Sequence, residues 1–547
     1  MNGLMMDFPL TLAAIFRRAE ALSSAREIVT RLPDKTIHRY RYRDFAERTR
    51  RLVRALHDLG VQPGDRVATL AWNHYQHLEA YFAVPLAGGV LHTLNLRLHH
   101  DELGYIINHA GDRALIVDRS LLPLYERIRP LVSIPAVIVV GDQNARPDDA
   151  GMLDYESLIA RAAPATDVAD PPEDTAAALC YTTGTTGQPK GVLYSHRSLV
   201  LHSFGIALAD VIGLCERDAI TPVVPMFHAN AWGLPYAAVM IGSKLVMPGP
   251  HLDPVNLADL MQRERVTITA GVPTLWMGLL QLLDANPGTY DLSSIRLMLV
   301  GGSAVPQAMI EAFEKRHGLR IVQGWGMTEM SPVGTLSHVP YAMAGAPPDE
   351  QYRQRAKQGR PLPFVELRAR NEHGLVPCDG KTMGELETRG PWIAASYFKR
   401  DDCGDRFTED GWFKTGDIVT IDERGTVDVQ DRSKDLIKSG GEWISSIALE
   451  NALMGHPAVA EAAVISIPDM TWSERPLAAV VLKAGASATP AELRAFLAPR
   501  FPKFWLPDAF EFIDAIPRTS AGKFQKAALR ERFRDRQASD QKRETAT

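Results

Sequence analysis

Residues 181–192, which read Tyr-Thr-Thr-Gly-Thr-Thr-Gly-Gln-Pro-Lys-Gly-Val, combine the residue types that a polyphosphate site requires. Glycines let successive N–H groups converge on an anion, while threonine hydroxyls and a lysine ammonium add donors and positive charge. The spacing differs from the Walker A pattern G-x-x-x-x-G-K-[ST]. A flexible surface linker of small residues is the alternative. The candidate phosphate-binding residues are Thr182, Thr183, Gly184, Thr185, Thr186, Gly187 and Lys190.

Two later loops, at residues 301–306 and 323–329, each follow a segment that reads as a buried strand. Small residues at strand ends let a flat ring lie against the backbone. The second loop adds an aromatic face, a hydroxyl and a carboxylate, which suit an adenine, a phosphate and a hard cation such as Mg²⁺. Tight turns closed by a packed tryptophan are the alternative. The candidate nucleotide-binding residues here are Gly302, Ser303, Ala304, Gly324, Trp325, Gly326 and Met327.

Two single residues complete the candidate chemistry. Asp417 stands at the entry to a predicted strand, where its carboxylate could accept hydrogen bonds from two ribose hydroxyls. A solvated turn aspartate is an equally good interpretation of that position. Lys523 follows small residues near the C-terminus, and a lone surface lysine is usually only solvated.

Composition limits the class of protein. With 547 residues and 46% apolar content, the chain is large enough for several core-bearing units. The 65 acidic and 60 basic residues are well mixed, which argues against a nucleic-acid partner. Four widely spaced cysteines argue against a disulfide framework and fit a reducing cytoplasm. No apolar run approaches a transmembrane length, so we expect a cytoplasmic protein with at most peripheral membrane contact.

Strand-like and helix-like segments alternate along the first 330 residues, which predicts α/β layering. A hairpin is expected at 27–32 and 37–42, followed by a helix over 44–59. Ligand sites in such folds lie in loops that leave the strands. The other expected strands are 67–71, 90–93, 114–117, 136–140, 176–180, 192–194, 221–224, 245–247, 268–270, 297–300 and 320–323.

The character of the sequence changes after residue 360. Short strands at 365–370, 384–388, 417–421 and 426–429, divided by turn sequences, predict a compact, barrel-like β unit. A charge cluster at 431–435 precedes strands at 464–467 and 478–482 and a capping box at 489–492. The predicted fold class is therefore α/β, with an N-terminal domain at 1–430, a hinge linker at 431–436 and a small α+β domain at 437–547.

Five segments, in this order and spacing, resemble the signature segments of the adenylate-forming superfamily: 181–192, 324–329, 414–417, 431–435 and 517–523. That superfamily includes acyl-CoA synthetases, peptide-synthetase adenylation domains and luciferases. Residues 224–232 and 435–445 are in addition similar to bacterial medium- and long-chain fatty acyl-CoA synthetases. Trp325 stands where many members carry tyrosine, which bears on adenine stacking and the acyl pocket rather than on the reaction class.

The resemblance implies ATP, Mg²⁺ and CoA as cofactors and a fatty acid as substrate. The acid would form acyl-AMP with release of pyrophosphate, and the thiol of CoA would then displace AMP. In this scheme residues 182–190 hold the β- and γ-phosphates, and Lys523 reaches the α-phosphate and the acyl carboxylate. The other implied nucleotide and metal ligands are Thr328 for the α-phosphate, Glu329 and Thr185 for Mg²⁺, Asp417 and Arg432 for the ribose, and Lys438.

The same resemblance implies where the second half-reaction takes place. The C-terminal domain would rotate at Lys434, withdraw Lys523 and present a new segment to the pantetheine arm. We expect Trp232 either to close the mouth of an acyl tunnel or to be ordinary core, since large aromatics mostly fill interiors. The implied CoA contacts are Gly440, Gly441, Glu442 and Trp443, and the implied acyl-pocket residues are Trp232, His228, Gly301 and Val333, with His228 also a catalytic candidate.

Other functions stay open at this point. Close relatives activate short sulfur-containing or aryl acids, and the sequence defines the size of the acyl pocket only loosely. A peptide-synthetase module would need a carrier domain, which we do not expect after Lys523. A non-catalytic nucleotide-binding protein would be expected to lose Lys523, Glu329 or Asp417, which are all present. Similar synthetases suggest a homodimer.

Overall fold

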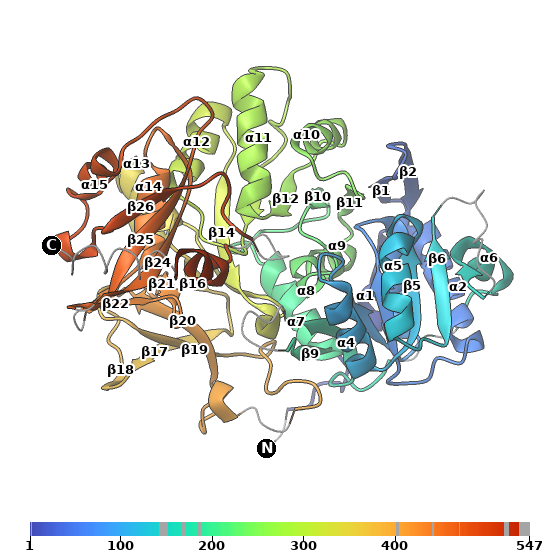
Figure 1. Cartoon of the computed structure of the whole chain (residues 1–547). Helices are drawn as coiled ribbons and strands as arrows, with labels where there is room; N and C mark the ends of the chain where they lie inside the picture. Colours follow the sequence, from blue (N-terminus) through green and yellow to red (C-terminus); the bar gives the residue numbers. More distant parts are fainter. Residues whose placement is uncertain are drawn as a thin grey trace.

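The computed structural model describes residues 1, 3–141, 151–166, 168, 170–182, 188–400, 404–439, 442–469, 471–518 and 524–534. Four sheets and the helices around them make up this part of the chain. Figure 1 shows the first large sheet with its helices at the right, the second large sheet in the middle and the C-terminal elements at the left. The architecture is the predicted mixture of α/β layers, a β unit and a small C-terminal α+β region.

The first large sheet has seven strands, and it is parallel apart from the pair β8 and β9. This antiparallel pair carries the predicted phosphate loop between its strands at the edge of the sheet, as expected. Along the chain, these apolar strands alternate with helices, and the helices cover the sheet. In sheet order the strands are β7 (Leu153–Asp154), β6 (Ala136–Val140), β5 (Asp112–Asp118), β3 (Arg66–Leu70), β4 (Val90–Thr93), β8 (Ala176–Tyr181) and β9 (Gly191–Ser195).

The second large sheet has nine strands, with a parallel centre and antiparallel strands at both ends. The expected hairpin forms one end as β1 and β2. Every residue of helix α3 (Tyr75–Leu86) is buried, because the helix packs in the core beside α1, α2 and strands of both large sheets. In sheet order the strands are β16 (Arg360–Pro361), β15 (Val333–Leu336), β14 (Ile321–Gly326), β13 (Leu297–Val300), β12 (Ile268–Gly271), β10 (Ala219–Pro222), β11 (Lys244–Met247), β1 (Glu27–Arg31) and β2 (Ile37–Arg41).

Amphipathic helices surround these sheets, and several begin with the residue types that cap helix N-termini. Thr11, Asp154, Ser195 and Asp253 each accept a hydrogen bond from a first-turn N–H group. The helices are α1 (Leu12–Leu22), α2 (Tyr42–Asp58), α4 (His100–Ala110), α5 (Leu122–Ile128), α6 (Tyr155–Arg161), α7 (His196–Ala207), α8 (Ala229–Trp232), α9 (Leu234–Ile241), α10 (Pro254–Arg263), α11 (Pro273–Ala285), α12 (Gln307–His317) and α13 (Pro348–Arg355).

The expected β unit is a five-stranded antiparallel sheet. Its last strand continues to Arg432, so the predicted linker at 431–436 begins inside a strand. The domain boundaries themselves stay a prediction. In sheet order the strands are β18 (Gly374–Leu375), β17 (Glu366–Asn371), β19 (Gly384–Arg389), β20 (Phe413–Ile421) and β21 (Val427–Arg432).

The C-terminal region contains a second five-stranded sheet with its own apolar core. The capping box predicted at 489–492 is present at the start of α15, where the side chain and backbone of Thr489 and Glu492 hydrogen-bond each other. The elements are β23 (Glu442–Ile444), β22 (Ile437–Ser439), β25 (Ser473–Leu482), β24 (Val459–Asp469), β26 (Ala509–Phe512), α14 (Ser446–Met454) and α15 (Pro490–Leu497).

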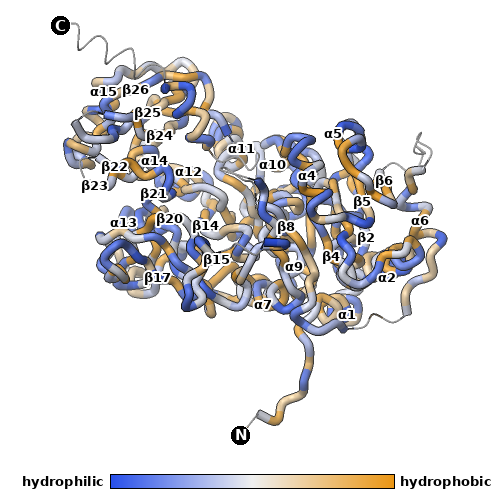
Figure 2. The backbone as a smooth tube through the Cα atoms, turned by 60° about the horizontal axis from the view of Figure 1, so that its bottom comes forward, coloured by the Kyte–Doolittle hydropathy of each residue, from blue (hydrophilic) through white to orange (hydrophobic). Residues whose placement is uncertain are grey.

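The N-terminal segment lies outside this core. Figure 2 shows it extending away from the body of the molecule, and its apolar side chains Leu4, Met5, Met6 and Phe8 are exposed. These residues therefore contribute little to the packing described above. Among the described residues, no helix is both long enough and apolar enough to cross a bilayer.

Candidate active site

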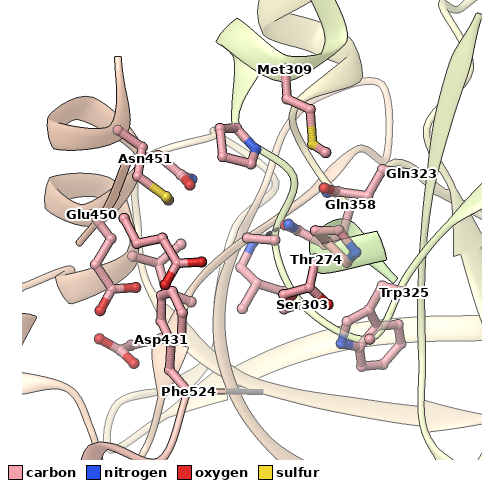
Figure 3. A pocket seen from close by; sticks show the side chains of 18 of the residues that line it. Thr274, Ser303, Met309, Gln323, Trp325, Gln358, Asp431, Glu450, Asn451 and Phe524 are labelled. Carbon is pink, nitrogen blue, oxygen red and sulfur yellow. Dashed lines mark hydrogen bonds between the residues drawn. The ribbon is translucent and has the colours of Figure 1, made fainter. Parts of the chain in front are cut away.

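A cavity of about 240 Å³ lies between the strand-end loops of the N-terminal region and the C-terminal region. Figure 3 shows Ser303 and Trp325 on one side of this cavity and Asp431, Glu450 and Phe524 on the other. The first side comes from the loop that follows β13, from the end of β14, and from Asp417 of β20 and Arg432 of β21, so the loop predicted at 323–329 begins inside a strand. The predicted nucleotide residues that line it are Gly302, Ser303, Ala304, Gly324, Trp325, Gly326, Asp417 and Arg432.

Close backbone approach explains the glycines in these loops. A Cβ atom on Gly301 would lie 3.0 Å from the Trp232 ring and 3.1 Å from the Gly324 carbonyl oxygen. A Cβ on Gly326 would lie 1.9 Å from the Pro332 carbonyl oxygen. The loop after β13 is further held by Val305, whose backbone N–H donates to the Gln323 side chain at 2.6 Å. The small residues thus bring backbone to the cavity wall.

Asp417 is the best-anchored side chain on this wall. It is 3% exposed, and its two carboxylate oxygens have different partners. The Trp325 indole N–H donates to Oδ2 at 2.9 Å, and the Arg432 Nε lies 2.7 Å from Oδ1. The tryptophan that replaces the usual tyrosine therefore contributes a hydrogen-bond donor as well as a ring face. Because each oxygen has a second lone pair, the carboxylate can still accept hydrogen bonds from a ligand.

Thr328 and Glu329 form a short 3-10 turn after β14, and both are buried. The Tyr194 hydroxyl donates to the Thr328 carbonyl oxygen at 2.6 Å, which ties this turn to β9. The Tyr397 hydroxyl donates to Glu329 Oε1 at 2.7 Å. The remaining carboxylate oxygen is a hard donor of the kind that Mg²⁺ prefers, so the residue fits a metal ligand.

Thr182 and Lys190, at the two ends of the predicted phosphate loop, hydrogen-bond to each other. The Thr182 backbone N–H donates to the Lys190 carbonyl oxygen at 2.9 Å, and the Lys190 N–H donates to the Thr182 hydroxyl at 3.3 Å. The Lys190 ammonium lies over the ring of Tyr397, 4.7 Å from its centroid. The rest of the predicted phosphate loop, Thr183, Gly184, Thr185, Thr186 and Gly187, lies outside the described residues.

A second cavity, of about 70 Å³, shares Thr274 and Gly302 with the first. His228 and Trp232 both line it, as the acyl-pocket prediction requires, and Trp232 is 8% exposed. These two residues are four positions apart, about the spacing of one helical turn, but the residues between them have positive φ angles. Asn230, with φ +52°, accepts a hydrogen bond from the buried Cys180 thiol at 3.1 Å. This tertiary contact accompanies a left-handed turn that places the Trp232 ring against Gly301.

The other wall of the cavity belongs to the C-terminal region and carries buried charges. Lys526 lies 2.8 Å from Glu450 and 3.9 Å from Asp431. Asp431 Oδ2 also accepts hydrogen bonds from the backbone N–H of Ser446, at 3.0 Å, and from its hydroxyl. Burial raises the pKa of Asp431 and raises the pKa of Glu450 to about 7, although Lys526 opposes both shifts. Asp431 sits on β21, so these contacts join the two regions.

Some predicted residues do not line either cavity. Val333 packs instead against His202 and Trp392, whose Nε2 and Nε1 atoms hydrogen-bond its backbone. Lys438 is exposed on β22, where it pairs with Trp443 of β23. Met327 is partly buried and Lys434 is exposed, and both fall outside the two linings. Lys523, Gly440 and Gly441 lie outside the described residues, as does the side chain of Glu442, whose backbone is part of β23.

The residues on either side of Lys523 are informative nevertheless. Arg518 and Phe524 both line the main cavity and form an isolated β-bridge with each other. The Arg518 guanidinium lies 4.8 Å from the Phe524 ring centroid and pairs with Glu461 at 2.5 Å. The nearest described residues on either side of Lys523 therefore both lie at the main cavity.

Comparison with protein families identifies the class of this chain. The AMP-binding enzyme family matches residues 16–398, and the C-terminal domain of the same enzymes matches residues 448–523. This chain is an AMP-binding enzyme. It therefore belongs to the adenylate-forming superfamily that the five sequence segments indicated.

Individual AMP-binding enzymes are similar over nearly the whole chain. A long-chain-fatty-acid–CoA ligase of Thermus thermophilus is 50% identical over 534 residues, with 97% of each chain covered. A 3-methylmercaptopropionyl-CoA ligase of Ruegeria pomeroyi is 46% identical and covers 98% of this chain and 99% of its own. A solved anthranilate CoA ligase in complex with anthranoyl-AMP has a TM-score of 0.84 at 27% identity, covering 96% of this chain and 98% of its own.

Sequence reasoning missed several residues of the site. Tyr397, Glu450 and Lys526 were not singled out, and Asp431 was noted only as part of a charge cluster. A lone carboxylate on the apolar helix that contains Glu450 was one usable signal, since buried carboxylates are normally paired with a cation. Nothing in the sequence around Tyr397 indicated that it contacts both Lys190 and Glu329.

Proposed function

We propose that this AMP-binding enzyme activates a fatty acid with ATP and then transfers the acyl group to CoA. The observation that carries the proposal is a single cavity lined both by Asp417 and by Arg518 and Phe524, the nearest described residues on either side of Lys523. Adenylation requires two anions to meet, so groups that bind ribose and groups that neutralise phosphate must face one cleft. The identity to CoA ligases over nearly the full chain supports the same reaction.

In the first half-reaction, an acid oxygen forms a bond to the α-phosphorus of ATP, and the bond to the β-phosphate oxygen breaks to release pyrophosphate. Asp417 and Arg432 would hold the ribose, and Thr328 would donate to an α-phosphate oxygen. Residues 182–190 would hold the β- and γ-phosphates. Lys523 would neutralise charge between the α-phosphate and the carboxylate, where it changes most in the transition state.

Glu329 is proposed as a ligand for Mg²⁺, with Thr185 as a second candidate from the phosphate loop. The metal would neutralise the triphosphate while it is bound. The Glu329 carboxylate is 5% exposed and has one oxygen fixed by the Tyr397 hydroxyl, so it is held in one orientation. A fixed carboxylate suits the strict octahedral geometry of Mg²⁺.

In the second half-reaction, the CoA sulfur loses its proton and forms a bond to the acyl carbon, while the bond to the AMP oxygen breaks. We propose that the C-terminal region rotates at Lys434 so that residues 440–443 replace the Lys523 segment beside the acyl-AMP. Arg518 and Phe524, on either side of Lys523, line the cavity whereas Lys438 and Trp443 do not, and this difference supports an adenylation step that uses the Lys523 segment.

The acyl chain is proposed to enter the second cavity, with Trp232 as its movable wall. Trp232→Ala should leave ATP affinity nearly unchanged and shift the preferred chain length, because each buried methylene is worth about 0.8 kcal/mol. The second candidate is a short sulfur-containing acid. The small volume of this cavity, about 70 Å³, and the similarity to the Ruegeria pomeroyi enzyme support this second candidate.

The test is pyrophosphate release with each of a series of acids from propionate to palmitate, followed by thioester formation with CoA. We expect pyrophosphate release that depends on both the acid and ATP. Lys523→Ala should slow that step by about 100-fold or more and spare thioester formation from supplied acyl-AMP. Nucleotide binding without acid-dependent pyrophosphate release would contradict ligase activity, and maximal activity with a short sulfur-containing acid would favour the second candidate.

A further inference from the structure

Residues 392–398 form a strap across the two large sheets of the N-terminal region. At one end, the Trp392 carbonyl accepts a hydrogen bond from the Ser331 hydroxyl at 2.9 Å, and the Ala394 N–H donates to the Glu329 carbonyl oxygen at 2.8 Å. At the other end, the Phe398 N–H donates to the Gly191 carbonyl oxygen at 2.9 Å. The strap therefore contacts both the loop after β14 and the start of β9.

Tyr397 is the residue of this strap that points at both proposed ligand groups. Its side chain is buried, and its hydroxyl donates to Glu329 Oε1 at 2.7 Å. Burial and the nearby Glu329 carboxylate raise the pKa of Tyr397 well above its ordinary value, so the hydroxyl keeps its proton. Arg406 also lies beside the hydroxyl. The hydroxyl therefore acts as a hydrogen-bond donor to the carboxylate throughout the neutral range.

The face of the same ring contacts Lys190. The ammonium nitrogen lies 4.7 Å from the ring centroid, within the range of a cation–π interaction. Such a contact orients the ammonium group without using any of its three N–H donors. Lys190 can therefore be held in place and still offer its hydrogen-bond donors to phosphate oxygens.

We propose that Tyr397 is a positioning residue. It holds the Glu329 carboxylate and the Lys190 ammonium in the relative positions that the magnesium-bound triphosphate requires. The inference rests on the proposed function, because it takes Glu329 as the metal ligand and Lys190 as a phosphate ligand. The two interactions also reinforce each other. A hydroxyl that donates to a carboxylate makes its ring more electron-rich, which strengthens the attraction of the ring face for the ammonium.

Simple packing is the alternative role for Tyr397. Its ring lies edge-on to Phe407 with centroids 6.2 Å apart, so the side chain also contributes to the apolar interior. A packing role predicts that a phenylalanine at this position works as well as tyrosine. The positioning role predicts that the hydroxyl and the ring have separate, measurable effects on different parts of the nucleotide.

The experiment measures binding of AMP and of an ATP analogue with a methylene bridge between its α and β phosphorus atoms, by calorimetry, with and without Mg²⁺. In Tyr397→Phe, loss of the donor to the carboxylate should weaken binding of the analogue in Mg²⁺ by about tenfold. Binding of the analogue without Mg²⁺ should change much less, because the ring face that contacts Lys190 remains. In Tyr397→Leu, loss of the cation–π contact should weaken analogue binding without Mg²⁺ as well, by about three- to tenfold.

AMP lacks the β- and γ-phosphates, so all variants should bind it like the wild-type enzyme. The matched control is Tyr42→Phe. It removes another buried hydroxyl, which donates to the Ser243 carbonyl oxygen at 2.7 Å and lies outside both cavity linings. It should lower the melting temperature without changing the effect of Mg²⁺. This control separates the loss of a buried hydrogen bond from the loss of metal positioning.

Two results would overturn the inference. If Tyr397→Phe showed the wild-type response to Mg²⁺, or if AMP binding fell together with analogue binding, Tyr397 would be a packing residue. Failure of the proposed function looks different, because it would appear in the wild-type enzyme as absence of acid-dependent pyrophosphate release. Wild-type affinity that ignores Mg²⁺ would overturn the role of Glu329 and this inference with it.

Discussion

The two walls of the main cavity are held in place by different kinds of contact. On the N-terminal wall, Asp417 and Arg432 are direct cross-strand partners in one sheet, and Trp325 lies at a strand end of another. On the C-terminal wall, the contacts that cross from the β unit include those from Asp431 to Ser446 and Lys526 and from Gln430 to Ser445. The first wall is built into sheets, and the second is attached by side chains.

This difference fits the two half-reactions. The proposed ribose site should stay intact through both steps, and strand pairing gives it that rigidity. In the proposed rotation the other wall leaves after adenylation, which requires contacts that can be broken together at moderate cost. Buried ion pairs serve this purpose, because attraction between the charges roughly offsets the cost of removing them from water.

The largest effect is expected from the built-in wall. Asp417→Ala removes the proposed acceptor for two ribose hydroxyls and breaks the ion pair with Arg432. We expect AMP affinity to fall by about 100-fold, since each charge-assisted hydrogen bond contributes about 1.5–3 kcal/mol. Both half-reactions should suffer equally, as measured by pyrophosphate release and by thioester formation from acyl-AMP. An effect on only one half-reaction would show that Asp417 acts together with the C-terminal wall.

The next largest effect concerns the attached wall. Asp431→Ala removes the carboxylate that accepts from Ser446 and faces Lys526, while the pair of Lys526 and Glu450 stays intact. We expect adenylation to slow by about 30-fold, the equivalent of about one lost charge-assisted hydrogen bond among those that hold this orientation. Thioester formation from acyl-AMP should stay close to the wild-type rate. Asp431→Asn keeps an acceptor and should recover part of the adenylation rate.

A smaller effect is expected from pH. Burial raises the pKa of Glu450 from an ordinary 4.5 to about 7, so the folded protein binds this proton more tightly than the unfolded chain. The stability that comes from Glu450 is complete below pH 4.5, falls as pH rises to about 7, and then stays low. Relative to Glu450→Gln, the wild type should lose about 1–3 kcal/mol of unfolding free energy between pH 5 and 8. Urea titrations at each pH measure this difference, and parallel curves would contradict it.

The smallest effect serves as the control for the attached wall. Thr489→Ala removes the cap of α15, away from the cavity, and should lower the stability of the C-terminal region by about 1 kcal/mol. Thermal unfolding followed by circular dichroism measures the loss. Both half-reactions should keep their wild-type rates. If this variant also slowed adenylation alone, the selective loss of adenylation in Asp431→Ala would be due to general weakening of the C-terminal region. It would then not be due to the contacts of Asp431.

Much of the fold could be predicted from the sequence. The strands at 90–93, 136–140 and 297–300 were predicted to the residue, the last two from apolar runs, because a strand buried on both faces needs continuous apolar side chains. The strand expected at 221–224 forms instead at Ala219–Pro222, displaced by two residues. In that region the apolar residues continue past the strand into the cavity wall, and periodicity alone cannot tell where the pairing stops.

The sequence by itself determined the family and the order of its ligand loops, because glycine, threonine and lysine at fixed spacing are local requirements of phosphate chemistry. The tertiary structure decided which distant side chains meet. Tyr397 reaches Glu329 across 68 residues, Trp325 reaches Asp417 across 92, and the turn before Trp232 is left-handed where its spacing suggested a helix. These contacts depend on how whole sheets pack against one another, and packing of that kind leaves no periodic signal in either partner's sequence.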